Sequence, residues 1–312
     1  MRTVFFGSPS CALPSLRGLI EAGHSVELVV TQPDKPAGRG RQMTPSAVKA
    51  FALERGLPVL EPARIRKDDT VLPRLRGARP DVHVVVAYGQ IIPGAIIDLP
   101  PHRSLNVHFS LLPRYRGAAP VQWTVLNGDA ETGVTIIVLN ERMDEGDILA
   151  RTRTEVGPRE TAVGLEARLA VLGARLLVET LGRLDSLVPV PQDHSTATMA
   201  PKIGKDLGRI VWSEPAAAVD RRVRALAGRP GAFTFLRGRR LELHEGRPLD
   251  ARAEGRRPGE VVRVGKEGVA VACGDGSVYL VEAVQPEGRN RMSGRDFANG
   301  AKVEAGETLG GS

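Results

Sequence analysis

Short apolar runs alternate with helical patterns over the first 190 residues, and this alternation constrains the fold more than any other feature. The run at 82–88 is almost continuously apolar, as expected for a strand covered by helices on both faces. Strands that alternate with helices form a doubly wound sheet with right-handed crossovers. The sequence therefore predicts an α/β domain with a mostly parallel, Rossmann-like sheet. Strands are expected at 3–6, 25–31, 82–88, 104–108, 135–139 and 148–155, and helices at 46–55, 69–76, 119–126 and 161–184.

The character of the chain changes after Leu187. Residues 188–194 are rich in proline, and a charged run follows at 202–206. Five short β-like runs broken by glycine then favour a small OB-like β-barrel, a frequent nucleic-acid binder. We expect a catalytic domain at 1–190, a linker at 191–207 and the barrel at 208–312. The barrel strands are expected at 232–236, 240–243, 259–264, 268–272 and 278–284, after a short helix at 220–227.

Size and composition set the outer bounds. A chain of 312 residues favours two domains. Its two cysteines, Cys11 and Cys273, form no metal-like pattern and favour a reducing, cytoplasmic location. The first apolar run is too short for a signal peptide or a membrane span. A net charge of +7 favours a polyanionic partner such as nucleic acid.

Two polar side chains mark the predicted strand at 104–108. Side chains alternate between the faces of a strand, so Asn106 and His108 share one face. In an open parallel sheet, ligands bind outside the carboxyl ends of the strands. The alternative is that both residues cap the strand and bond to loop backbone. His83, within another strand, is interpreted as a satisfied core or edge histidine and not as a catalyst.

An acidic loop, Met143-Asp144-Glu145-Gly146-Asp147, follows another apolar strand. A carboxylate brought beside an imidazole orients it and favours its charged form. The loop and the rigid turn after His108 favour a proton-transferring site over simple capping. The first βα turn lacks the Gly-x-Gly-x-x-Gly pattern, which argues against a dinucleotide-dependent oxidoreductase.

The segment 32–45 contains three prolines and two glycines, and we expect it to be irregular. Lys35, Arg39 and Arg41 make it basic. A long irregular segment in a compact domain is usually functional, although a solvated basic loop is the competing interpretation.

These motifs together resemble the folate-dependent formyltransferase family. The resemblance rests on Asn106-x-His108, Ser110-Leu111-Leu112-Pro113, Tyr115-Arg116-Gly117, the acidic loop at 143–147 and the basic loop at 31–40. It covers nearly all of the first domain and is weaker in the second. Phe109 stands where a small residue is common in the family.

The resemblance implies an activity. The donor would be 10-formyltetrahydrofolate, without a metal. The acceptor would be the α-amino group of methionine on initiator tRNA, for translation initiation in the cytoplasm by a monomeric enzyme. Asn106, His108 and Asp144 would be catalytic. Asn106 would donate a hydrogen bond to the developing oxyanion, and His108, if cationic, would donate another. Asp144 would hold His108, favour its charged form and help to relay a proton.

The resemblance also implies binding residues. Ser110, Leu111, Leu112 and Pro113 would bind tetrahydrofolate, with help from Tyr88, Gly89 and Gln90. Lys35, Arg39 and Arg41 would contact the RNA. The alternatives are a formyltransferase that acts on a small amine, such as glycinamide ribonucleotide or an amino sugar nucleotide, and a non-catalytic RNA-binding protein.

Overall fold

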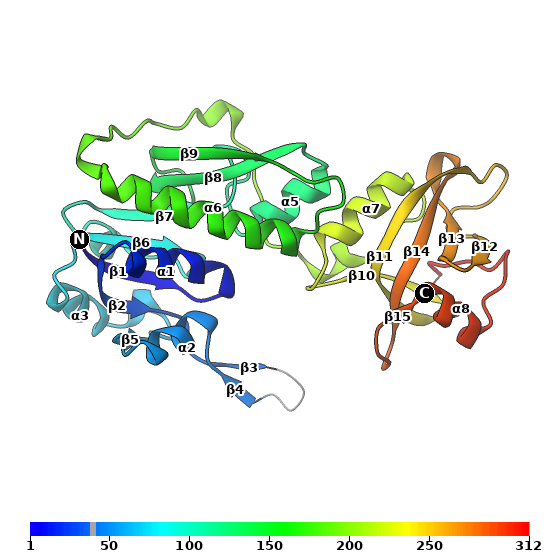
Figure 1. Cartoon of the computed structure of the whole chain (residues 1–312), viewed down its shortest axis with the longest axis horizontal. Helices are drawn as coiled ribbons and strands as arrows, with labels where there is room; N and C mark the ends of the chain where they lie inside the picture. Colours follow the sequence, from blue (N-terminus) through cyan, green and yellow to red (C-terminus); the bar gives the residue numbers. More distant parts are fainter. Residues whose placement is uncertain (38–41, 312) are drawn as a thin grey trace. The chain divides into compact units, whose positions relative to one another are not determined.

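The computed structural model describes residues 1–37 and 42–311 (Figure 1). The chain forms two compact units. The first comprises Met1–Pro120, Glu131–Glu155 and Glu166–Pro201, and the second comprises Val121–Ala130, Val156–Leu165 and the chain from Lys202 on.

A seven-stranded sheet forms the centre of the first unit, in the order β5-β2-β1-β6-β7-β8-β9. The pairs from β5 to β7 are parallel, whereas β8 is antiparallel to both β7 and β9. This confirms the predicted α/β class with its mostly parallel sheet. The strands are β1 (Arg2–Gly7), β2 (Ser25–Val30), β5 (Val59–Leu60), β6 (Val82–Val86), β7 (Ser104–His108), β8 (Glu131–Val138) and β9 (Ile148–Glu155).

Helices cover both faces of this sheet. On one face, α6 packs so closely that a Cβ on Gly173 would lie 2.9 Å from the Val107 side chain. On the other face, buried side chains of α3 and α4 join one core cluster with Val4 and Phe6 of β1. Ser46 begins α2 because its hydroxyl accepts a hydrogen bond from the Lys49 N–H at 3.1 Å. The helices that belong to this unit are α1 (Leu13–Glu21), α2 (Ala47–Glu54), α3 (Val71–Gly77), α4 (Gly94–Ile97) and most of α6 (Ala162–Gly182).

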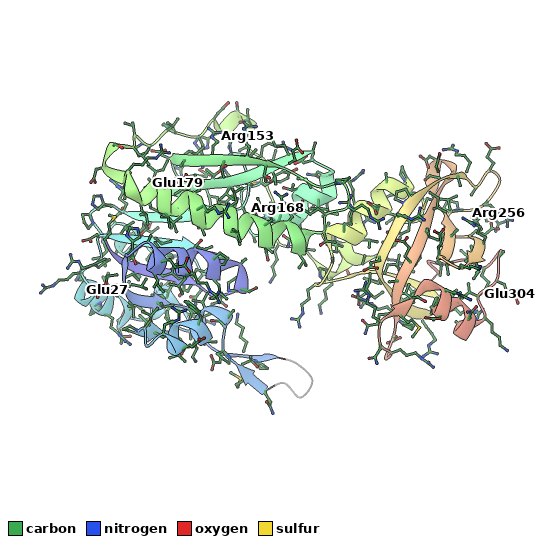
Figure 2. All side chains as sticks on the ribbon, in the orientation of Figure 1. Glu27, Arg153, Arg168, Glu179, Arg256 and Glu304 are labelled. Atoms are coloured by element: carbon green, nitrogen blue, oxygen red, sulfur yellow. The ribbon has the colours of Figure 1, made fainter. Side chains whose placement is uncertain are left out.

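One edge strand of this sheet, β9, shows the alternation of half-buried and exposed side chains that is expected at a sheet edge. Its burial alternates between half-buried and exposed residues from Ala150 onward. Arg153 points outward, where it pairs with Glu131 of β8 (Figure 2). Charged side chains on an edge strand discourage pairing with another chain.

The basic segment differs from its predicted irregular form. Lys35–Ala37 (β3) and Gln42–Thr44 (β4) pair as an antiparallel ribbon, with Lys35 opposite Thr44. The prediction of irregular structure was wrong for these flanks, because prolines are tolerated on a two-stranded ribbon whose edges are free. Arg39 and Arg41 lie outside the described residues.

An antiparallel sheet forms the second unit, in the order β10-β11-β14-β13-β12, with β15 paired to β14. The C-terminal segment joins the two edge strands. The Leu309 N–H donates to Gly259 O beside β12, and the Gly310 N–H donates to Phe235 O of β10. These bonds close the sheet into a barrel. Its elements are α5 (Pro120–Asn127), α7 (Ala216–Ala225), β10 (Ala232–Leu236), β11 (Arg239–Arg252), β12 (Val261–Gly265), β13 (Gly268–Ala272), β14 (Ser277–Pro286), β15 (Met292–Ser293) and α8 (Gly294–Ala301).

Candidate active site

Strand β7 presents Asn106 and His108 on the face opposite α6. Their neighbours Val107 and Phe109 point the other way, and a Cβ on Gly173 of α6 would lie 3.4 Å from the Phe109 ring. Phe109 therefore fills the core under the helix and does not line the face that carries Asn106 and His108. Asn106 is 9% exposed and His108 6%, so both are mostly shielded from water.

The loop between β8 and β9 brings Asp144 to these two residues. Asp144 Oδ1 lies 3.4 Å from Asn106 Nδ2 and 3.7 Å from His108 Nδ1. Its other oxygen, Oδ2, accepts a hydrogen bond from the Gly117 N–H at 2.8 Å. The structure thus brings together the three residues predicted to be catalytic.

This approach requires an unusual backbone. Because β8 runs antiparallel to β7, it ends beside the start of β7, and the Leu139 N–H donates to Ser104 O. The loop then folds back so that Asp144 reaches the middle of β7. Asp144 has a φ of 54°, in the left-handed region that costs a non-glycine residue roughly 1–3 kcal/mol. The surrounding contacts must hold it there.

The two ring nitrogens of His108 face different partners. Nε2 lies 2.9 Å from the Tyr115 carbonyl oxygen. A carbonyl can only accept, so we assign the proton of the neutral ring to Nε2. Nδ1 then carries the lone pair of the neutral ring and faces Asp144.

The turn after β7 is held by internal hydrogen bonds. The Ser110 hydroxyl donates to Arg114 O at 2.7 Å, and the Thr135 hydroxyl donates to Ser110 O at 2.7 Å. The Leu112 N–H donates to that Thr135 hydroxyl, and the Leu112 side chain is fully buried. Ser110 and Leu112 therefore shape the turn, whereas Leu111 and Pro113 are only half-buried and keep exposed surface.

The Tyr88-Gly89-Gln90 turn follows β6. The Tyr88 ring is buried edge-on against Phe6, and burial raises the pKa of its hydroxyl above the usual range. Gln90 bonds to the backbone at both ends of its amide, accepting from the Ile65 N–H and donating to Pro62 O. These two side chains serve the fold, and the Tyr88 carbonyl accepts from Gln32 Nε2 at 2.8 Å. Exposed Gly89 is the part of the turn that is placed to contact a ligand.

The basic ribbon supplies one described candidate for RNA binding. Lys35 is exposed, and its ammonium group donates to the Gln32 amide oxygen.

Three residues around the site were not predicted from sequence to act there. Gly117 donates its N–H to Asp144, and buried Arg116 bonds to Gln192. Gln192, from the segment predicted to be a linker, donates to Asp144 O at 2.8 Å. The Tyr115-Arg116-Gly117 motif was a signal for the first two. No sequence signal pointed to Gln192, because its partners lie more than 40 positions away.

Residues 1–37 and 42–311 show neither a membrane-spanning helix nor a cluster of metal ligands. No helix there combines the length and hydropathy that a bilayer crossing requires. No group of three His, Cys, Asp or Glu side chains is arranged to hold a metal ion.

Comparison with known proteins covers both units. The formyl transferase family matches residues 1–181, and the formyl transferase C-terminal domain matches residues 202–302. The methionyl-tRNA formyltransferase of Solibacter usitatus is 48% identical over 312 residues, covering 99% of each chain. That of Anaeromyxobacter dehalogenans is 48% identical over 305 residues, covering 97% of each chain.

Among solved structures, WlaRD has a similar fold. It is a sugar 3N-formyl transferase crystallised in the presence of dTDP and 5-N-formyl-THF. Its TM-score is 0.67 at 16% identity, over 93% of this chain and 99% of that chain. At this identity the likeness extends to the fold alone.

Proposed function

The chain belongs to the formyl transferase family, and we propose that it transfers a formyl group from 10-formyltetrahydrofolate to the α-amino group of methionyl initiator tRNA. The product, N-formylmethionyl-tRNA, serves translation initiation in the cytoplasm. The observation that carries the proposed chemistry is the meeting of Asn106, His108 and Asp144 at one point of β7. The acceptor is inferred from relatives that are 48% identical over nearly their whole length.

The donor set suits formyl transfer. The reaction needs a hydrogen-bond donor for a carbonyl oxygen that gains negative charge, and a group that can hold a proton near neutral pH. A neutral amide and an imidazole fulfil these two needs. 10-Formyltetrahydrofolate supplies the formyl group, and we propose that Leu111, Pro113 and the backbone of residues 88–90 contact it, within the turns formed by Ser110, Leu112, Tyr88 and Gln90.

Each catalytic residue has a proposed part. Asn106 carries two N–H groups, of which one is directed to Asp144 and the other can donate to the developing oxyanion. The amine of methionine loses a proton as its nitrogen bonds to the formyl carbon. We assign His108 Nδ1 to receive this proton and pass it toward the departing nitrogen, with Asp144 stabilising the imidazolium. Because Nε2 is bonded to Tyr115 O, Nδ1 is the nitrogen that remains for this role. His108 then has no further N–H for the oxyanion, so we assign that contact to Asn106 and not, as expected from the sequence, to both residues.

RNA contacts complete the proposal. We propose that Lys35, with Arg39 and Arg41, contacts the acceptor end of the tRNA, and that the OB-like barrel at 208–312 binds the tRNA as well. We propose a monomer.

Substitution of the β7 pair tests this function. Wild type should formylate methionyl-tRNA when 10-formyltetrahydrofolate is supplied. Asn106→Ala and His108→Ala should each lower kcat by roughly 10²–10³-fold, the usual effect of losing one such group. His102→Ala is the matched control, because that histidine of the same unit is 36% exposed and lies 3.5 Å from Asp185. With folding checked by circular dichroism, wild-type turnover in His108→Ala would contradict the assignment.

A further inference from the structure

A strap of chain, residues 190–200, crosses the first unit beside the active site. At one end, Val190 exchanges two backbone hydrogen bonds with Ile148 of β9, at 2.8 and 2.9 Å. At the other end, the Ala200 N–H donates to Arg116 O at 2.7 Å. The strap therefore joins the edge of the sheet to the turn that follows β7.

Gln192 of the strap is buried and uses its whole amide. Nε2 donates to Asp144 O at 2.8 Å and to Gly146 O at 2.7 Å. Oε1 accepts from Arg116 Nε at 3.1 Å and from Arg116 Nη2 at 2.8 Å. One side chain thus bonds to the backbone of the acidic loop and to the turn after β7.

Arg116 connects this amide to the far side of the Asp144 carboxylate. Its guanidinium group is buried beside Glu145, with Nη1 and Oε1 3.5 Å apart. The next residue, Gly117, donates its N–H to Asp144 Oδ2. Gln192 therefore holds Asp144 in two ways. It bonds directly to the backbone carbonyl oxygen of Asp144, and it acts indirectly through the Arg116-Gly117 backbone.

We propose that Gln192 is a positioning residue for formyl transfer, which sets the Asp144 carboxylate against Asn106 and His108. This rests on the proposed function. Asp144 occupies a backbone conformation that its neighbours must impose. Hydrogen bonds to the carbonyls on both sides of Glu145 impose it, and a displacement of about 1 Å can cost a factor of 10² in rate.

Gln192→Glu is the decisive variant. It keeps an acceptor for Arg116 but replaces the donor NH₂ by an oxygen that faces two carbonyls. We expect kcat to fall roughly 10–10²-fold while KM for both substrates changes little, because Gln192 is buried and its amide is fully bonded to the protein. Gln192→Met, similar in length and without a donor, should give the same loss. Ser195→Ala is the control on the strap, since its hydroxyl bonds to Asp193 at 2.6 Å.

Two further readouts separate positioning from general destabilisation. In an Asp144→Ala background, Gln192→Glu should cause no further loss of kcat, because its effect passes through Asp144. Amide hydrogen exchange in residues 139–147 should accelerate in Gln192→Glu, whatever acceptor the enzyme uses. Full additivity with Asp144→Ala, unchanged exchange, or wild-type kcat would each overturn the proposal. Failure of wild type to formylate methionyl-tRNA would instead contradict the proposed function, and the exchange measurement would still test the role of Gln192.

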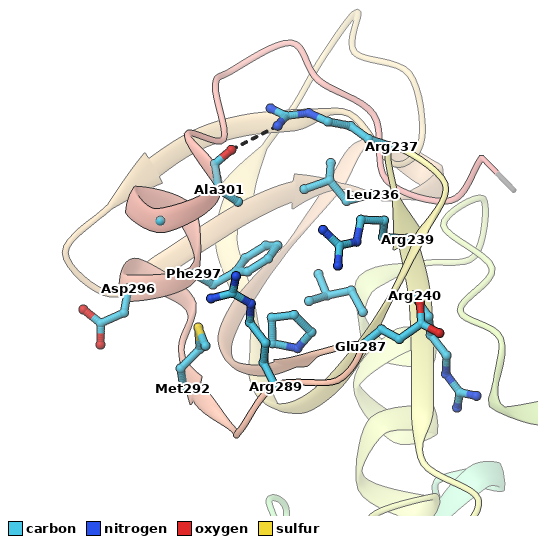
Figure 3. Close-up of a pocket in the computed structure, with 13 residues that line it drawn as sticks. Leu236, Arg237, Arg239, Arg240, Glu287, Arg289, Met292, Asp296, Phe297 and Ala301 are labelled. Carbon is cyan, nitrogen blue, oxygen red and sulfur yellow. Dashed lines mark hydrogen bonds between the residues drawn. The ribbon is translucent and has the colours of Figure 1, made fainter.

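A second, independent observation concerns a pocket of about 270 Å³ in the barrel unit (Figure 3). Leu236, Leu241 and Phe297 form an apolar floor and are each less than 9% exposed. The volume is close to the lower end of the range for small-ligand sites, about 300 Å³. The pocket therefore suits a single small unit.

Two arginines of this pocket are free to bind an anion. Arg237 already bonds to Glu307 and to Ala301 O, and Arg240 lies over the Phe233 ring at 4.0 Å. By contrast, the guanidinium groups of Arg239 and Arg289 have no hydrogen-bond or ion-pair partner among the described residues. Figure 3 shows both beside Phe297, while the carboxylate of Asp296 points away.

We infer that this pocket binds one nucleotide of the acceptor tRNA, again on the premise of the proposed function. Arg239 and Arg289 would hold a phosphate, because guanidinium groups match its geometry. The adjoining nucleoside would cover the apolar floor. Such a contact fixes the RNA on the barrel without reading its sequence.

Salt-dependent tRNA binding tests this site. Arg239→Ala and Arg289→Ala should each weaken binding of methionyl-tRNA, and the double variant should reduce the salt slope by about 1 for each phosphate that the protein no longer neutralises. Arg263→Ala is the matched control, an exposed arginine of β12 outside the pocket. If all three single variants weakened tRNA binding equally, the general positive charge of the barrel would explain the effect. That result would contradict the proposal that this pocket binds a nucleotide. If the wild type shows this salt-dependent tRNA binding but does not formylate methionyl-tRNA, the proposed function is wrong. The proposal that the pocket binds a nucleotide would then still hold.

Discussion

At the scale of single residues, the buried histidines His83 and His108 of the first unit have different surroundings. His83 of β6 is fully buried, and its Nδ1 lies 3.1 Å from the Ser104 hydroxyl. That hydroxyl already donates to Ile97 O, so the histidine must donate to it. Burial lowers the pKa of His83 to about 3. His83 therefore stays neutral and structural, in agreement with its interpretation as a core or edge histidine.

This burial should make stability depend on pH. The unfolded state binds a proton on His83 below about pH 6.5, whereas the folded state binds it only near pH 3, so the free energy of unfolding falls as pH drops through this window. The expected loss is about 2–4 kcal/mol. Denaturant unfolding of wild type and His83→Leu at several pH values would measure it. The variant should lose this component of the slope.

His244→Gln is the control for that series, because His244 is a half-buried histidine of the barrel unit. It should leave the acid dependence of the first unit unchanged. An identical pH slope in wild type and His83→Leu would show that His83 is protonated in the folded state.

At the scale of elements, Gly117 connects the strap to the turn after β7. Its φ is 124°, and a Cβ there would lie 2.7 Å from Ala200 O. Gly117→Ala should therefore displace the strap and loosen the bond from the Gly117 N–H to Asp144. We expect destabilisation of roughly 1–3 kcal/mol together with a lower kcat. Thermal unfolding and steady-state kinetics would measure the two effects.

Gly182→Ala provides the comparison, because nothing lies within 4 Å of a Cβ at Gly182 and its φ is not positive. It should behave as wild type. Gly117→Ala with the activity of Gly182→Ala would contradict the role assigned to the strap.

Periodicity explains which elements could be predicted. Strands β7 and β9 begin and end where the sequence indicated, because apolar and polar residues mark both faces. Period two also predicted that Asn106 and His108 share a face. The antiparallel direction of β8 could not be predicted, since strand direction leaves no mark on composition. The short helices α4 and α8 have too few turns for a clear period, and both were missed.

The three residues of the candidate site could be named from the sequence, whereas the groups that hold them in place could not. Asn106, His108 and Asp144 belong to recognisable motifs, and the structure brings them together. Their supports are backbone carbonyls, such as Tyr115 O and Asp144 O, which every residue type carries. A sequence does not show which carbonyl meets which side chain. For this reason neither the hydrogen bond between His108 Nε2 and Tyr115 O nor the contacts of Gln192 could be predicted.

At the scale of the whole molecule, the chain combines an α/β unit that carries the candidate site with a barrel unit. The sheet of the first unit and the barrel of the second followed from turn spacing and strand composition. Closure of the barrel did not, because it depends on backbone bonds from Leu309 and Gly310 that no hydrophobic pattern marks. The proposed function uses both units, since the first carries the chemistry and the second a binding surface for the acceptor.

The identity of the acceptor is the most direct test of the proposed function. Purified protein would be incubated with 10-formyltetrahydrofolate and, in separate reactions, with methionyl initiator tRNA, glycinamide ribonucleotide or an amino sugar nucleotide. Each product would be scored for a blocked amine. We expect formylation of methionyl-tRNA and of neither small acceptor. Formylation of a small acceptor with none of methionyl-tRNA would contradict the proposed function, although the chemistry assigned to Asn106, His108 and Asp144 would remain.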